Sequence, residues 1–138
     1  YRDLQNSLRH LDPSGFIVLD DVFPHDRYAA IPSQALAYKT RLEQTGERNR
    51  HWQGDVYRVL KKIVDDHPEL DFRLYGPSKS PMAVVWRHSS GRRGHPTARR
   101  FPRAGELTYT DFCEWKSRDM RLVVNDPQEI TELIRPPA

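Results

Sequence analysis

The sequence has few of the features that mark secreted and membrane proteins. It contains one cysteine, Cys113, so no disulfide can form within the chain. A single cysteine is typical of a reducing compartment, and we expect a cytoplasmic protein. No apolar run approaches the roughly 18 residues that a membrane span needs, and no signal peptide is visible. We therefore expect no membrane partner.

Glycine is also scarce. The 7 glycines are scattered along the chain. The closest pair, Gly91 and Gly94, lies in the polar stretch GRRG and not in a turn that leads from a strand into a helix. Dinucleotide and phosphate sites of the Gly-rich type require that turn, so this sequence does not contain one.

The chain length and composition indicate one domain with a low share of apolar residues. Its length is 138 residues, its hydrophobic share is 37% and its formal net charge is +3. That charge is too small to imply a nucleic-acid partner by itself. The first residue is Tyr1, and a helical pattern starts almost at once. We expect the sequence to be part of a longer protein.

The clearest strand signal is FIVLDDV, which starts at Phe16. Its apolar residues are continuous and β-branched residues are frequent, which is typical of a strand buried on both faces, as in a parallel sheet. A helix at 3–11 precedes it and ends at the turn signal Asp12-Pro13-Ser14-Gly15. The strand is therefore expected to lie inside the sheet.

The rest of the chain alternates helices with a pair of strands. Residues 52–66 repeat apolar side chains at helical spacing, and 71–76 and 82–87 indicate an antiparallel hairpin. Three further helices are expected: a short one near 33–43, one at 109–118, and one that starts after Asp126-Pro127.

This order predicts an α/β fold in which helices flank one parallel-type strand and a C-terminal antiparallel hairpin. We divide the chain into a sheet-forming part, 1–87, an Arg-rich loop, 88–105, and a helical extension, 106–138. The hairpin supplies one neighbour for the strand, but no segment supplies the other. We expect pairing with a missing N-terminal half or with a second copy of the chain.

Two stretches together carry a family resemblance. GFIVLDD and WQGDVYRVLKKIVDDHPELDF, followed by the hairpin, resemble the C-terminal half of class I S-adenosylmethionine-dependent methyltransferases. The closest likeness is to small-molecule O-methyltransferases in which a strand ends in Asp-Asp, and it covers residues 1–87. The resemblance implies a partial Rossmann-like sheet and S-adenosylmethionine as cofactor. Most of the cofactor site would belong to the N-terminal half, so its residues stay unidentified and the chain alone is expected to be inactive or nearly so.

Asp20 and Asp21 end the strand, where open α/β sheets place their ligand crevice. Two adjacent carboxylates are unfavourable unless they share a cation or a proton. The resemblance implies that they bind magnesium, together with a further acid upstream of Tyr1, and that the metal acidifies a substrate hydroxyl. Two alternatives remain open: both acids cap turns in water, or they position the substrate without a metal.

Three further residues are candidates for the substrate site. His25 follows Asp20 by five residues and could act as general base, because its ordinary pKa lies near neutrality. An exposed loop histidine is the alternative. His51 and Trp52 begin the predicted helix at 52–66 and could line a substrate pocket. Trp52 could instead be a packing anchor.

Residues 72–105 contain no acid but eight basic side chains: Arg73, Lys79, Arg87, Arg92, Arg93, Arg99, Arg100 and Arg103. They predict either an anion-binding flap or a solvated loop. The nearby aromatic residues are too few for a base-stacking platform, so nucleic acid is not an expected partner.

The sequence as a whole predicts methyl transfer from S-adenosylmethionine to a hydroxyl of a small metabolite, with or without magnesium. The alternative is a non-enzymatic binding module that holds an anionic partner on its Arg-rich loop.

Overall fold

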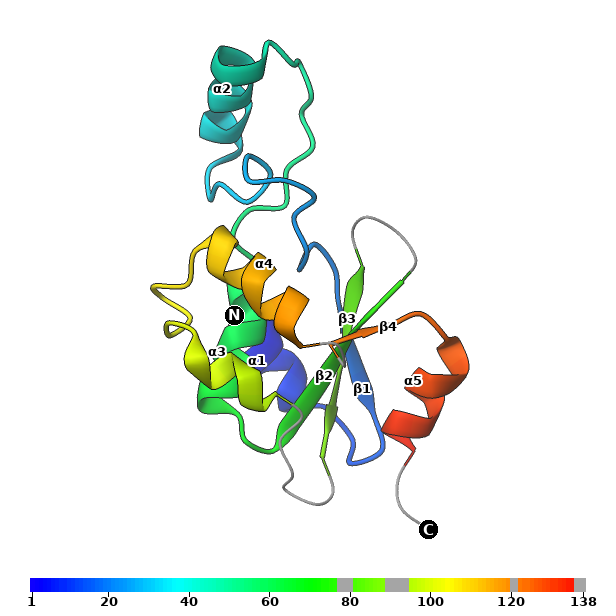
Figure 1. Cartoon of the computed structure of the whole chain (residues 1–138). Coiled ribbons are helices and arrows are strands. Elements are labelled where there is room, and N and C mark those ends of the chain that lie inside the picture. The colour runs from blue at the N-terminus through cyan, green and yellow to red at the C-terminus, as the bar shows by residue number, and fades with distance from the viewer. Residues whose placement is uncertain (77–80, 89–94, 120–121, 136–138) are drawn as a thin grey trace.

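A computed structural model describes residues 1–76, 81–88, 95–119 and 122–135. It is an α/β fold with a four-stranded mixed sheet between helices (Figure 1). This confirms the predicted fold class and is consistent with part of a Rossmann-like sheet. The elements follow in the order α1 (Arg2–Leu8), β1 (Phe16–Leu19), α2 (Gln34–Thr45), α3 (Arg58–Asp66), β2 (Leu70–Tyr75), β3 (Met82–Arg87), the 3-10 helix η1 (Pro96–Arg100), α4 (Tyr109–Arg118), β4 (Val123–Val124) and α5 (Pro127–Ile134).

The strands lie in the order β1-β3-β2-β4. β2 and β3 form the predicted antiparallel hairpin, and β3 also pairs antiparallel with β1. β1 and β2 therefore run in the same direction, and the chain between them includes α3, which packs against β2. β4 extends the sheet by pairing with β2 in parallel. The sequence patterns predict neither β4 nor η1.

The prediction that β1 is buried on both faces is wrong. Among the residues that the structure describes, β1 pairs with β3 alone and forms one edge of the sheet, which we call the β1 edge. Ile17 and Leu19 pack against the main core, whereas Phe16 is 51% exposed and Val18 is 47% exposed. A continuous apolar run shows that both faces of a strand are apolar. It does not show that the same chain covers both faces.

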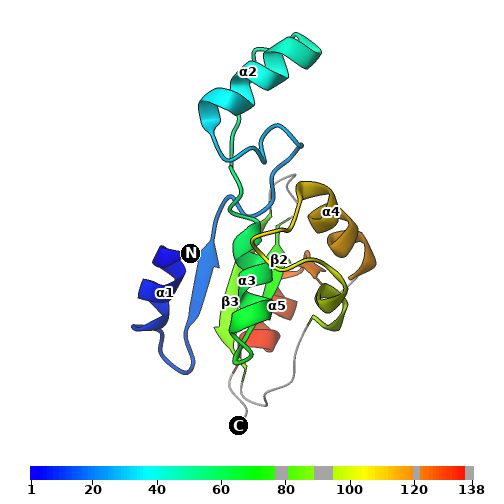
Figure 2. The same ribbon diagram turned by 90° about the vertical axis from the view of Figure 1, so that its left-hand side faces the viewer.

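Helices cover the two faces of the sheet unequally. α1, α3 and α4 lie on one face and α5 lies on the other (Figures 1 and 2). On the α5 face, Val84 and Trp86 of β3 form a small core with Ile130. Phe16 pairs with Trp86 and Val18 with Val84, so both exposed side chains lie on this same face. α5 packs against β2 and β4, toward the other end of the sheet, which we call the β4 edge.

The main core lies between the sheet and the other helices, and all three predicted segments of the chain contribute to it. β2 passes through its centre, where Phe72 and Leu74 are fully buried. Phe112 and Trp115 of α4 pack into the same cluster. A capping box at Thr108 starts α4 at the residue that the sequence predicts.

The helix predicted at 52–66 begins later than expected, at Arg58. Residues 54–57 form turns, and Gly54 has a φ of 70°, a left-handed conformation that favours glycine. A side chain at Gly54 would lie 3.1 Å from the Trp52 ring. The turn therefore delays the helix although the apolar spacing starts earlier.

Residues 26–52 form a projecting arm that leaves the sheet after β1 and returns to α3 (Figures 1 and 2). Its helix is α2, close to the short helix expected near 33–43. The Ser33 hydroxyl accepts the Leu36 N–H at the start of α2, and Gly46, with a φ of 73°, ends it.

Candidate functional site at the end of strand β1

Asp20 and Asp21 lie next to each other at the surface, where β1 ends. Oδ1 of Asp20 accepts the backbone N–H of Asp21 at 2.8 Å. Asp21 has a φ of 57°, which few residues other than glycine adopt. Partial burial and then the neighbouring Asp20 carboxylate raise the pKa of Asp21. The chain thus holds two like charges together where a bound cation would relieve their repulsion.

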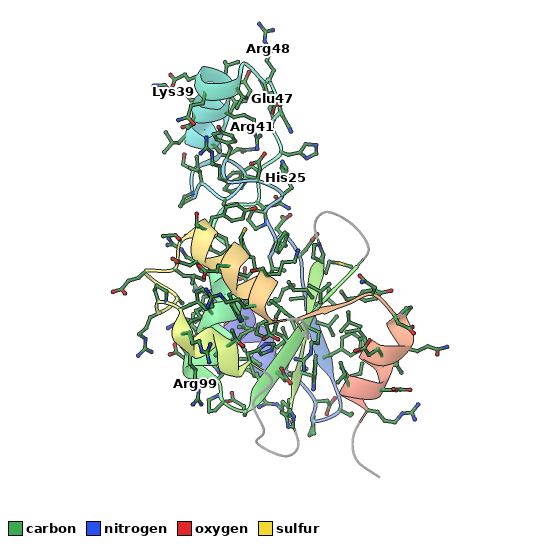
Figure 3. The ribbon with its side chains drawn as sticks, viewed as in Figure 1. His25, Lys39, Arg41, Glu47, Arg48 and Arg99 are labelled. Atoms are coloured by element: carbon green, nitrogen blue, oxygen red, sulfur yellow. The ribbon has the colours of Figure 1, made fainter. Side chains whose placement is uncertain are left out.

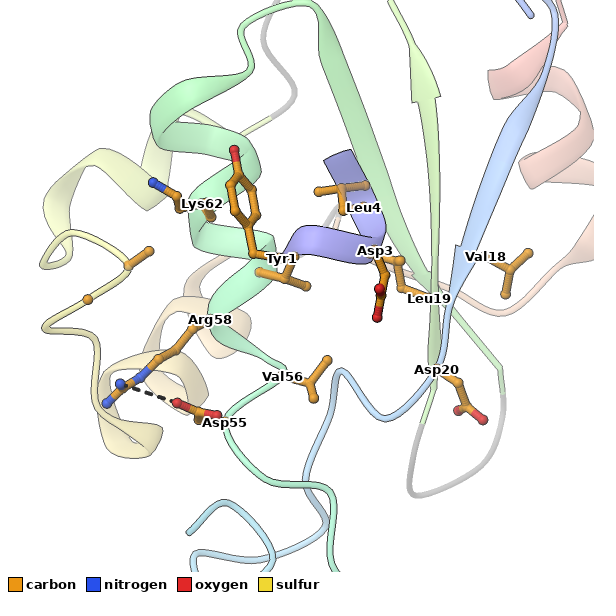
Figure 4. A pocket seen from close by; sticks show the side chains of 13 residues that line it. Tyr1, Asp3, Leu4, Val18, Leu19, Asp20, Asp55, Val56, Arg58 and Lys62 are labelled. Carbon is orange, nitrogen blue, oxygen red and sulfur yellow. Dashed lines mark hydrogen bonds and ion pairs between the residues drawn. The ribbon is translucent and has the colours of Figure 1, made fainter. Parts of the chain in front are cut away.

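A groove of about 550 Å³ begins at Asp20, at the end of β1, and extends between the starts of α1 and α3 (Figure 4). Leu19 contributes to its wall on the β1 side, and Leu4 contributes on the α1 side. On the α3 side, Asp55 pairs with Arg58 at 3.5 Å. The complete lining is Tyr1, Asp3, Leu4, Val18, Leu19, Asp20, Asp55, Val56, Arg58, Val59, Lys62, Ala104 and Gly105. The predicted site residue Asp20 therefore borders a hollow with apolar walls.

The carboxylates of Asp20 and Asp21 are the type of ligand that magnesium prefers, but two of them do not complete a magnesium site. Carboxylate oxygens are hard ligands of the kind that magnesium prefers. Within the described part of the chain, however, no group of three or more His, Cys, Asp or Glu side chains could hold a metal ion. Asp20 and Asp21 would therefore contribute two ligands to a site that water, substrate or other residues complete.

His25 lies at the base of the arm, held between two protein groups (Figure 3). The Gln53 amide nitrogen donates to the Phe23 carbonyl, which turns Gln53 Oε1 toward His25. Nδ1 of His25 then donates to that oxygen at 3.1 Å. Nε2 is buried and lies 3.3 Å from Asp26 Oδ2, outside hydrogen-bond geometry. Both ring nitrogens thus face the protein, and a general-base role would require the ring to turn.

The structure brings His51 to His25 but ties Trp52 into the arm. The two histidine rings meet edge to face with their centroids 5.7 Å apart, and His51 is exposed. The Trp52 indole donates to the Ile31 carbonyl at 2.7 Å, and 38% of the residue is exposed. This geometry supports the packing alternative for Trp52, while His51 remains open to a ligand.

The sequence gives little sign of the residue that organises the arm, which is Arg41. Its guanidinium is buried and donates from Nη2 to both carboxylate oxygens of Asp26, at 2.8 and 2.9 Å (Figure 3). Nη1 donates to the carbonyls of Asn49 and His51. Burial raises the pKa of Asp26, but the Ala29 N–H and Arg41 outweigh it, so the net pKa is lowered. Arg41 and Ala37, four positions apart, are the two buried residues of α2, but the sequence pattern does not single out Arg41.

The described basic residues of 72–105 do not form one surface. Arg73 is buried against Asp71, and Arg103 lies 3.1 Å from Asp66. Arg87 donates to the Leu8 carbonyl. Arg99 and Arg100 are exposed on η1. Lys79, Arg92 and Arg93 lie outside the described residues. The described part of this stretch therefore presents separate cations whose roles are largely structural.

Across residues 1–76, 81–88, 95–119 and 122–135, every helix is too short or too polar to cross a lipid bilayer. No family model, curated protein or solved structure matches the chain.

Proposed function

We propose that the chain is the C-terminal part of a class I methyltransferase that moves a methyl group from S-adenosylmethionine to a hydroxyl of a small metabolite. The observation that carries the proposal is the placement of Asp20 and Asp21. They end a strand that runs in the same direction as β2 and is separated from it by the antiparallel β3. Open α/β sheets bind ligands beyond such strand ends.

Asp20 and Asp21 would hold magnesium if the enzyme uses it. Coordination to a divalent cation lowers the pKa of a substrate hydroxyl and orients its oxygen toward the methyl donor. The raised pKa of Asp21 supports this role, because a cation favours the charged form that burial and Asp20 disfavour. The two aspartates would in either case fix the acceptor hydroxyl at the end of β1.

The β1 edge supports the idea that the sheet continues in the N-terminal half of the same enzyme. Phe16 and Val18 expose apolar side chains on the α5 face, and among the described residues only β3 pairs with β1. An added strand would pair with the outer side of β1, and a helix layer would cover Phe16 and Val18. That half would contain most of the cofactor site. In its absence, two copies of the chain can pair at this edge.

His25 and His51, whose rings meet edge to face, would approach the acceptor from the arm, although neither lines the groove at Asp20. Trp52 would hold the arm in place. We place the enzyme in the cytoplasm because the chain has a single cysteine. A purely anion-binding module is the weaker proposal, because Arg73, Arg87 and Arg103 already contact protein groups.

The test is S-adenosylmethionine binding by the protein produced from its complete gene, followed by methyl transfer to a panel of hydroxylated acceptors with magnesium or EDTA. We expect cofactor binding with a dissociation constant below about 1 mM, the upper range for enzyme ligands. Asp20→Asn and Asp21→Asn should keep this binding and lower transfer by about 10²-fold or more.

Glu114→Gln is the matched control, because it removes an exposed carboxylate of α4 that pairs with Arg118 and does not line the groove. Its transfer rate should equal that of the wild type. Absence of S-adenosylmethionine binding by the complete protein would refute the proposal. Full activity of both aspartate variants would remove the two acids from the site.

A further inference from the structure

Four charged residues are buried together where the C-terminal segment meets the sheet. Asp71 and Arg73 belong to β2, His95 precedes η1, and Asp119 ends α4. All four are at most 8% exposed. Buried ions are costly unless they are paired, so the charges in this cluster must balance.

Both ring nitrogens of His95 face oxygen atoms. Nε2 lies 2.9 Å from Asp71 Oδ1 and 3.0 Å from the Phe72 carbonyl oxygen. Arg73 Nη1 lies 3.3 Å from Nε2, but it donates its two hydrogens over shorter distances, to Asp71 Oδ1 at 2.8 Å and to the Phe72 carbonyl at 2.7 Å. Nδ1 lies 3.3 Å from Asp119 Oδ2. A neutral imidazole has one N–H donor and one acceptor, whereas the protonated ring has two donors. The surroundings therefore match an imidazolium that bridges two carboxylates.

Among these four side chains, a protonated ring balances the charges. Asp71 and Asp119 contribute two negative charges, and Arg73, whose Nη1 donates to Asp71 at 2.8 Å, contributes one positive charge. A protonated His95 supplies the second. The ring is stacked on Phe72, with centroids 4.1 Å apart, and meets Trp115 edge to face. These aromatic contacts exclude water from the bridge.

We propose that His95 is a protonation-dependent latch that holds the segment from η1 through α4 to β4 against β2. Protonated, it joins β2 to the end of α4 through Asp71 and Asp119. Deprotonated, it keeps one N–H donor and loses its positive charge beside Asp71 and Asp119, and the segment separates more easily from β2. The latch contains none of the candidate site residues Asp20, Asp21, His25 and His51, and it is independent of the proposed methyl transfer.

The pKa shifts agree with this arrangement. Burial lowers the pKa of His95, but the hydrogen bonds to Asp119 and Asp71 outweigh burial and the Arg73 charge, so the net pKa is raised. Burial raises the pKa of Asp71, but His95 and Arg73 outweigh it, so that pKa is lowered. α3 also packs on η1, but its Lys61 and Asp65 pair with each other.

The direction of the pH effect follows from the raised histidine pKa. The folded protein binds this proton more tightly than the unfolded chain does. The stabilisation is therefore complete below the ordinary histidine pKa of about 6.5, and it is lost as the pH rises through the higher pKa of the folded protein. The β2–β4 contact should loosen on the alkaline side.

The first test is an NMR titration of the histidine rings in the wild-type chain, with exposed His10 as internal reference. We expect His95 to carry protons on both nitrogens at neutral pH and to titrate above His10. A His95 that titrates at or below His10 would overturn the proposal. This measurement needs no variant, so it decides the question even if substitutions prevent folding.

The second test is amide hydrogen exchange at the junction. The Leu74 N–H donates to the Leu122 carbonyl at 2.7 Å and reports on the contact between β2 and the segment before β4. Between about pH 6 and about pH 9, its protection, corrected for the intrinsic rate, should fall roughly tenfold for each pH unit by which the His95 pKa is raised.

His95→Gln and Asp119→Asn should remove most of this pH dependence. His10→Gln and Glu114→Gln, which change exposed residues, should keep it. Equal pH dependence in the wild type and His95→Gln would overturn the latch. So would a wild-type protection at Leu74 that does not change with pH.

Discussion

The two edges of the sheet differ in how far the described residues cover them. At the β4 edge, β4 adds a parallel strand, α5 covers one face and the His95 cluster joins α4 to β2. At the β1 edge, the described residues pair no strand with the outer side of β1, and Phe16 and Val18 stay exposed. The chain thus completes one end of its own sheet and leaves apolar surface at the other.

This difference explains why the β1 edge is the candidate for contact with further protein. Exposed apolar strand edges invite pairing, and proteins normally cover or charge them. The β4 edge shows that this chain has the means to cover an edge, through a strand, a helix and a buried ion cluster. Among the described residues, no strand, helix or ion cluster of this kind covers the outer side of β1. This difference supports the proposal that the sheet continues beyond β1.

The largest expected contrast is in stability. Leu74→Ala in β2 removes a fully buried side chain and should lower the free energy of unfolding by about 2–5 kcal/mol. Val18→Ala removes a side chain that is 47% exposed and should change it by no more than about 0.5 kcal/mol. Urea denaturation monitored by circular dichroism measures both. Similar losses would show that the β1 edge is covered in solution.

A smaller contrast is expected in association. The chain should self-associate with rising concentration, and Val18→Lys should return it to the monomer, because a charge on an exposed strand edge opposes pairing. Light scattering after size exclusion gives the mass. Leu36→Lys on α2 is the control, since Leu36 is also an exposed apolar residue, at 52%, but lies on the arm. A wild-type chain that stays monomeric would contradict the prediction that the β1 edge pairs with a second copy.

The smallest effect is expected at the end of β1. Asp21→Ala should cost about 1 kcal/mol, because alanine is strained in the left-handed conformation that Asp21 adopts. Asp21→Asn tolerates that conformation and removes the charge. The raised pKa of Asp21 means that the wild type loses stability as the pH rises through the range just above about 4, and the asparagine variant should not.

Thermal denaturation at several pH values separates the two Asp21 effects. If Asp21→Asn destabilises the protein as much as Asp21→Ala, the carboxylate itself makes a stabilising contact, and its repulsion by Asp20 is not the dominant interaction.

Local patterns predicted the elements well where one helix or strand decides the outcome. The predicted helix at 109–118 and the predicted strands at 71–76 and 82–87 agree within one residue with α4, β2 and β3. β1 was located correctly, but its burial depends on which strands lie beside it. That is a property of the whole sheet, and the run FIVL does not encode it.

The candidate site could be predicted only in part, because some of its residues are neighbours in the sequence and others meet only in the folded chain. Adjacent acids at a strand end are visible in the sequence, and Asp20 and Asp21 lie where that pattern suggests. The buried pairs were not visible, because Asp26 meets Arg41 across 15 positions and His95 meets Asp119 across 24. Only folding makes such residues neighbours, and a lone arginine or histidine gives no periodic signal.

The way Arg41 fastens the arm has a consequence for how this protein can diversify. Its guanidinium holds Asp26 at the start of the arm and the carbonyls of Asn49 and His51 near the end, so the arm is closed from within. Because these contacts lie within the arm, its tip can be replaced or lengthened while both of its ends keep their positions. Related proteins could therefore differ in α2 and its turns while the sheet beneath stays unaltered.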